Sequence, residues 1–158
     1  MEARNLAPQT AGIEMTKNKQ AAPTWFTIVA WTMVVWNLMG LAAFFAQMTM
    51  SEAAMSELPE DQQKLYGEIP PWVIVAFAVA VFCGTAGAIL LALKNKLSIP
   101  VLMLSLVGVL IQNGYMFFGS DTVAVMGAGQ MILPAIVVLI SIALVPLSLF
   151  AKKSNWMN

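Results

Sequence analysis

The sequence has no histidine and only one cysteine, Cys83, among its 158 residues. Without histidine, the chain lacks the side chain that most often serves proteins as general base, pH switch or metal ligand. A single cysteine cannot form a disulfide within the chain. No glycine-rich phosphate loop, paired-cysteine motif or nucleophile motif occurs either. The sequence therefore predicts that the protein is not an enzyme and holds neither a metal nor a cofactor.

Charged residues are also scarce. They make up 10% of the chain, and hydrophobic residues make up 59%. Soluble domains carry about 25% charged residues. A chain this apolar has too few polar side chains to cover a water-exposed surface, so the composition predicts an integral membrane protein.

Four apolar runs are each long enough to cross a bilayer as a helix, which takes roughly 20 residues. None of the four contains a charged residue. Barrel strands are short and alternate apolar with polar residues, whereas these runs are long and continuous. The sequence therefore predicts an all-α, four-helix membrane bundle with spans at residues 24–50, 71–93, 97–119 and 130–151.

Basic residues are distributed unevenly around these spans. Seven of the eight lie in the tails 1–23 and 152–158 or in the turn 94–96, and only Lys64 lies on the other side. Positive residues mark the cytoplasmic side of a membrane. Both tails are therefore predicted to be cytoplasmic, and the loop that contains Lys64 is predicted to be outside.

That outer loop carries its own helix signal. Pro59 can start a helix, and the acidic side chains of Glu60 and Asp61 would suit its first turn. Apolar residues follow at three-and-four spacing, which predicts an amphipathic helix on the outer membrane surface. The alternative is that this helix covers a site between the spans. The surface helix is favoured, because such spacing by itself indicates packing.

The second span carries small residues at every fourth position. Small residues let helix backbones approach closely in a membrane. This ridge predicts that the second span is the central helix of the bundle or the seam of an oligomer. Its members are Ala76, Ala80, Gly84, Ala88 and Ala92.

Amide and aromatic side chains interrupt the first and third spans. Asn37 and Gln47 share one face of the first span, and Gln112 and Tyr115 share one face of the third. Asn113 points about 100° away from Gln112, as neighbours on a helix do. If the two faces oppose each other, they predict a polar site formed by Trp36, Asn37, Gln47, Gln112, Asn113 and Tyr115.

Two interpretations of this polar site remain open. In the first, which is favoured, Asn37 and Gln112 bond across the helices and set their register, contributing about 0.6–2 kcal/mol. In the second, the amides line a cleft for a neutral, hydroxyl-rich solute, because amides both donate and accept hydrogen bonds. No charged side chain is embedded in the spans, although proton-coupled carriers use one. The small four-span multidrug exporters depend on a glutamate in their first span. This chain has Asn37 there instead, so the sequence argues against that family.

Three stretches together resemble a family of small four-span bacterial inner-membrane proteins often labelled "sugar transporter". They are "WNLMGLAAFFAQMTM", "LPEDQQKLYGEIPPW" and "FAVAVFCGTAGAILLALKNK". The resemblance covers roughly residues 25–151, and its most specific motifs are Trp36-Asn37 followed by Gly40, and the stretch 65–72. It implies a bacterial inner-membrane location and a sugar-like solute.

The function predicted from these features is a permease-like protein for a neutral, sugar-like small solute. The alternative is a non-transporting accessory or scaffolding subunit of a membrane complex. The predicted partners are the lipid bilayer, further copies of the chain or another membrane protein, and a neutral small solute; no nucleic acid is expected.

Overall fold

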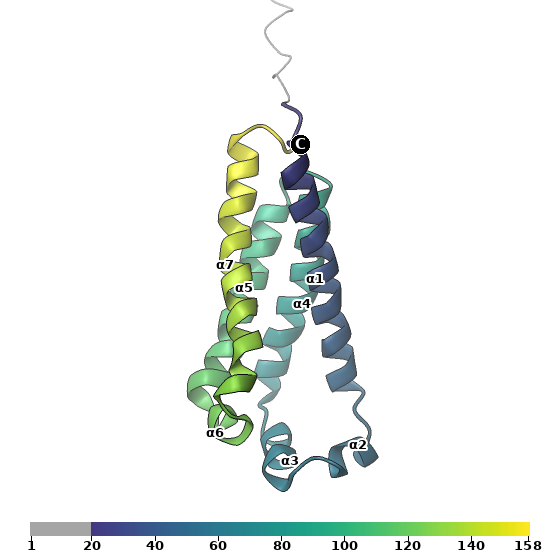
Figure 1. Cartoon of the computed structure of the whole chain (residues 1–158), viewed down its shortest axis with the longest axis vertical. Coiled ribbons are helices and arrows are strands. Elements are labelled where there is room, and N and C mark those ends of the chain that lie inside the picture. The colour runs from purple at the N-terminus through teal and green to yellow at the C-terminus, as the bar shows by residue number, and fades with distance from the viewer. Residues whose placement is uncertain (1–19) are drawn as a thin grey trace, which may run out of the picture.

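The computed structural model describes residues 20–158, which are helical and contain no strand (Figure 1). Four helices are long and apolar enough to cross a membrane. They are α1 (Thr24–Met48), α4 (Pro71–Ala92), α5 (Ser98–Gly114) with its π-helical extension η1 (Tyr115–Gly119), and α7 (Ile132–Lys153).

These helices confirm the prediction of an all-α chain with four helices of membrane length. The ends of the predicted spans lie within two residues of the structural ones. The predicted tail 1–23 falls outside the described residues, apart from residues 20–23.

Short helices fill the two loops at one end of the molecule. The first loop contains α2 (Glu52–Ser56) and α3 (Glu60–Gly67), and the second contains α6 (Thr122–Met126) and the 3-10 helix η2 (Ala128–Met131). Ser51 caps α2 by accepting a hydrogen bond from the Ala54 N–H at 3.1 Å. α3 begins directly after Pro59, as predicted, and packs against α6.

α4 is the central helix. It packs against α1 on one side and α5 on the other, and α7 packs against α5 (Figure 1). All five residues of the small-residue ridge are buried between these neighbours. The ridge therefore serves packing within the chain and is not available as the seam of an oligomer.

α4 and α5 approach each other closely at Gly108. A Cβ added there would lie 2.7 Å from the Ala76 carbonyl oxygen and 2.8 Å from the Ala80 nitrogen. One turn earlier, the Ser105 hydroxyl donates a 2.7 Å hydrogen bond to the Ala80 carbonyl. The absence of a side chain at Gly108 thus allows a polar bond to form between two apolar helices.

The chain folds back on itself at the end opposite the short helices. The backbone N–H of Asn158 donates to the Lys94 carbonyl at 2.7 Å, and the Lys96 N–H donates to the Asn158 carbonyl at 3.1 Å. Lys94 and Asn155 both adopt a positive φ, near 58°, as they end α4 and α7. These two turns bring the last residues of the chain against the α4–α5 turn.

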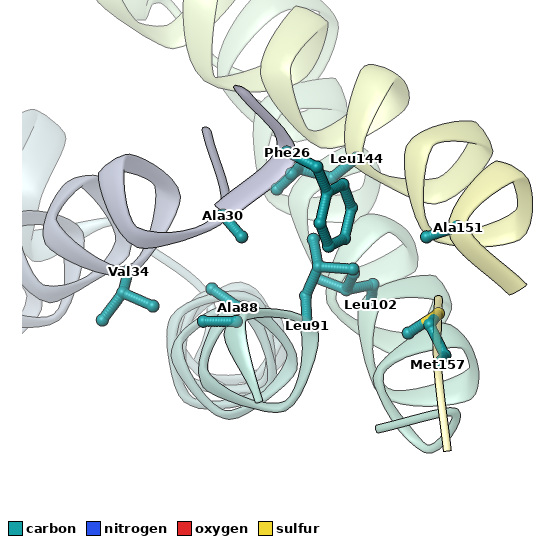
Figure 2. Close-up of a cluster of buried hydrophobic side chains, with 10 residues drawn as sticks. Phe26, Ala30, Val34, Ala88, Leu91, Leu102, Leu144, Ala151 and Met157 are labelled. Atoms are coloured by element: carbon teal, nitrogen blue, oxygen red, sulfur yellow. The ribbon is translucent and has the colours of Figure 1, made fainter. Parts of the chain in front are cut away.

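This folded-back segment closes the bundle with apolar side chains (Figure 2). Phe26 and Leu91 are fully buried, and Met157 is nearly so. Trp156 packs its ring 5.4 Å from Phe26 and 5.3 Å from Phe150, measured between centroids. The start of α1 and the end of α7 are therefore joined here, whereas the two helices diverge toward the short helices (Figure 1).

Candidate functional site: a cavity between the four long helices

A cavity of about 470 Å³ lies where α1 and α7 diverge, and all four long helices line it. α4 and α5 form its floor, because each packs against two long helices, while α1 and α7 form its two walls. The outermost wall residues, Met39 of α1 and Leu133 of α7, are 63% and 60% exposed. The cavity therefore opens sideways between α1 and α7.

Five of the six predicted site residues line this cavity: Trp36, Asn37, Gln47, Gln112 and Asn113. The sixth, Tyr115, does not. Its ring packs edge-on against Trp72, with centroids 5.5 Å apart, and faces a smaller cavity. Tyr115 begins the π-helical turn η1 and shares this smaller cavity with Gln112, which lines both cavities.

Asn37 occupies a notch over Gly84. Its side-chain nitrogen donates a 2.8 Å hydrogen bond to the Met33 carbonyl one turn back. Its side-chain oxygen lies where a Cβ of residue 84 would be, so the amide fits only because Gly84 has no side chain. Thr85 adds a 3.3 Å hydrogen bond from its hydroxyl to the Asn37 backbone carbonyl. The small-residue pattern predicted only a packing role for Gly84, whereas in the structure Gly84 also lines the cavity floor.

The favoured interpretation of the polar site expected a hydrogen bond between Asn37 and Gln112, and none forms within residues 20–158. The Asn113 amide, like that of Asn37, donates to its own helix, to the Val109 carbonyl at 2.9 Å. Gln112 makes only a 3.9 Å contact with the Met116 sulfur. The physical reason is that α4 lies between α1 and α5, and a carbonyl one turn back is the nearer partner.

Asn113 was expected to point away from the face of Gln112, yet both residues line the cavity. Asn113 is 5% exposed, whereas Gln112 is half-buried. The cavity accommodates both because it extends from the α4 side of α5 to the α7 side.

The amides retain unused hydrogen-bonding capacity. A primary amide offers two N–H donors and a carbonyl acceptor, and Asn37 and Asn113 each use one donor. The Gln47 amide makes no hydrogen bond to residues 20–158. No charged side chain of the described chain lines the cavity, so the site offers neutral donors and acceptors and nothing to balance an ionic charge.

A second cavity of about 130 Å³ lies between α3 and the long helices. Leu65, Tyr66 and Ile69, in and just after α3, line one side of it. It shares four lining residues with the main cavity: Gln47, Phe77, Gln112 and Met116. α3 thus lies over the second cavity, which adjoins the main one.

No family model, curated protein or solved structure matches the chain. The likeness to four-span proteins labelled "sugar transporter" therefore stays a prediction from the sequence motifs. Within residues 20–158, no group of three or more His, Cys, Asp or Glu residues comes together to hold a metal ion.

Proposed function

We propose that the protein is a permease-like membrane protein that binds an uncharged, hydroxyl-bearing solute of sugar type in the cavity between its four long helices. The observation that carries this proposal is the set of cavity amides with unused donors and acceptors, in a site lined by no charged side chain. Burying a polar group without a partner costs free energy. A hydroxyl both donates and accepts, so it can satisfy these amides without bringing a charge.

The size and the walls of the cavity also fit such a solute. Ligand pockets span about 300–1,000 Å³, and this cavity measures about 470 Å³. Trp36 and Phe77 add aromatic surface beside the amides. Aromatic faces pack against the apolar faces of a sugar ring, so the lining combines both kinds of contact that a neutral polyol needs.

The two ends of the bundle suggest the direction of access. The end that holds Lys94, Lys96, Lys152 and Lys153 is sealed by the apolar cluster around Phe26. Basic residues favour the cytoplasmic side, so we assign this sealed end to the cytoplasm of a bacterial inner membrane, with both termini inside. In this conformation the sealed end blocks access from the cytoplasm, and the solute reaches the cavity through its open side between α1 and α7.

Uptake into liposomes tests the transport function directly. Purified protein reconstituted in liposomes should take up labelled neutral monosaccharides faster than empty liposomes do. Ala43→Trp should abolish the difference, because Ala43 lines the cavity and an indole there would fill it. Ala42→Trp is the matched control, since Ala42 is its exposed neighbour and does not line the cavity. Uptake equal to that of empty liposomes across a broad panel of sugars would overturn the proposal.

A second candidate function is a non-transporting scaffold subunit that binds another copy or another membrane protein. The observation in its favour is the open side between α1 and α7, whose wall residues Met39 and Leu133 are exposed. A scaffold would bury these wall residues against a partner. Cross-linking from Met39→Cys in a Cys83→Ala background, in native membranes, would detect such a partner as a higher-mass band.

A further inference from the structure

The cavity has two chemically distinct zones. Its floor contains deep polar side chains: Asn113 is 5% exposed and Ser105 is 6% exposed. Its mouth, between α1 and α7, is apolar and open, as the exposed side chains of Met39 and Leu133 show. A bound molecule therefore meets hydrogen-bonding groups at one end and hydrocarbon at the other.

We propose that the molecule bound here is a neutral amphiphile, with a hydroxyl-bearing head on the cavity floor and a hydrocarbon chain that leaves between α1 and α7 into the bilayer. This inference rests on the proposed function and narrows its substrate class from a free sugar-like solute to one that carries an alkyl chain. The head would contact the amides of Asn37, Gln112 and Asn113.

Inside a bilayer, the two zones of the cavity restrict which molecule can bind. An apolar opening at membrane depth faces lipid chains rather than water, and each polar group left unsatisfied there costs several kcal/mol. A free sugar would leave the apolar mouth unfilled, and a lipid chain alone would leave the amides facing hydrocarbon. A hydroxyl-bearing head joined to a chain satisfies both zones at once.

The opening is shorter than a membrane-spanning helix, so a partner's transmembrane helix would not lie in it over its full length. On α1 the lining residues run from Trp36 to Gln47, which is roughly 17 Å of helix at about 1.5 Å per residue. A spanning helix needs about 30 Å. Toward the lysine-rich end, Phe26 and Leu144 belong to one buried cluster that joins α1 to α7, so the opening stops there (Figure 2). An alkyl chain, which is thin and flexible, fits the shorter opening.

The absence of charge in the cavity lining determines which head group can bind there. An anionic phosphate buried at this depth would need a cation or several strong donors to offset the loss of its hydration. The residues that line the cavity include no Lys, Arg or His. The head is therefore uncharged, with hydroxyl groups as the chemistry that the amides recognise.

Photo-crosslinking of the full chain in lipid nanodiscs tests this inference. Three probes carry the same photoreactive alkyl chain: one ends in a glucoside, one in a phosphate monoester, and one has no polar head. The glucoside probe should label residues near Met39 and Leu133 roughly tenfold more than either other probe, which corresponds to about 1.4 kcal/mol. Equal labelling by all three probes would show only lipid filling a crevice and would overturn the inference.

Two pairs of variants locate the effect. Ala43→Trp should remove the glucoside labelling, while Ala42→Trp should retain it, because only Ala43 lines the cavity. Gln112→Met removes an amide whose only contact is a weak one with Met116 and keeps a side chain of similar length, so the fold should persist. In this variant, glucoside labelling should fall toward that of the headless probe, whose labelling stays unchanged. Unchanged glucoside labelling in both Ala43→Trp and Gln112→Met would overturn the inference.

Either experiment, labelling or uptake, can fail while the other succeeds, so the two proposals are tested separately. Uptake of free monosaccharides without head-dependent labelling would overturn the amphiphile and leave the proposed permease intact. Head-dependent labelling without sugar uptake would support the amphiphile and overturn transport of free sugars.

Discussion

Replacing Gly108 with alanine should force α4 and α5 apart. The new Cβ would lie 2.7 Å from the Ala76 carbonyl oxygen, 2.8 Å from the Ala80 nitrogen and 3.1 Å from the Ala80 Cα. All three are backbone atoms, so no side-chain rotation relieves the contact. The helices must separate by about 0.7 Å to restore an ordinary van der Waals distance.

The cost has two parts. Overpacking of a close-packed interior costs about 1–3 kcal/mol. Separation also stretches the 2.7 Å bond from Ser105 to the Ala80 carbonyl, and such bonds in membranes contribute about 0.6–1.7 kcal/mol. We expect Gly108→Ala to lower the free energy of unfolding by roughly 2–4 kcal/mol.

Gly114 supplies the matched control on the same helix. Nothing lies within 4 Å of a Cβ built there, and its backbone is helical, with φ −56° and ψ −43°. Gly114→Ala should therefore be neutral or stabilise the protein by up to about 1 kcal/mol, because alanine favours the helix. Unfolding by SDS titration in mixed micelles, followed by circular dichroism, measures both variants. Equal free energies of unfolding for the two variants would refute the close approach of α4 and α5.

Four further outcomes follow from the same contacts. Ser105→Ala should cost about 0.6–1.7 kcal/mol in the SDS titration, and no loss would mean that its 2.7 Å bond contributes nothing. Gly84→Ala should displace the Asn37 side chain and lower glucoside labelling several-fold; unchanged labelling would exclude the notch from the site. Trp156→Ala should release the last residues of the chain, which pack on Phe26, and limited proteolysis should then cut them faster than in wild type. Labelling should stay constant between pH 5 and 8, because no acidic, basic or histidine side chain of the described chain lines the cavity; a sigmoidal pH profile would contradict this.

The helices themselves were predictable because hydropathy is a local property. A continuous uncharged run of about 20 residues is long enough to cross a bilayer as a helix, and a proline or lysine marks its boundary. Pro59 thus marked the start of α3. The small residues at every fourth position of α4 predicted a close approach of backbones, either at the centre of the bundle or at the seam of an oligomer.

The site was only partly predictable. The amides stood out within apolar runs, and five of the six predicted residues do line one cavity. Their partners did not follow from spacing. A helical asparagine can bond its own carbonyls one turn back, as Asn37 and Asn113 do, and the sequence pattern is the same whether the amide bonds its own helix or its neighbour. Leu133 and the other apolar wall residues of α7 gave no signal, since apolar residues occur on every side of this helix.

The sequence by itself determined that the chain has four membrane-length helices, where each begins and ends, and which end of the bundle is basic. These depend on runs of neighbouring residues. Only the tertiary structure decided that α4 separates α1 from α5, that the last residues seal the lysine-rich end, and that α1 and α7 diverge around a cavity. The reason is physical: lipid is as apolar as the interior of the bundle, so hydrophobic patterning cannot tell which face of a membrane helix points inward. That choice is made by contacts between distant residues, such as the Asn37 amide in the notch of Gly84.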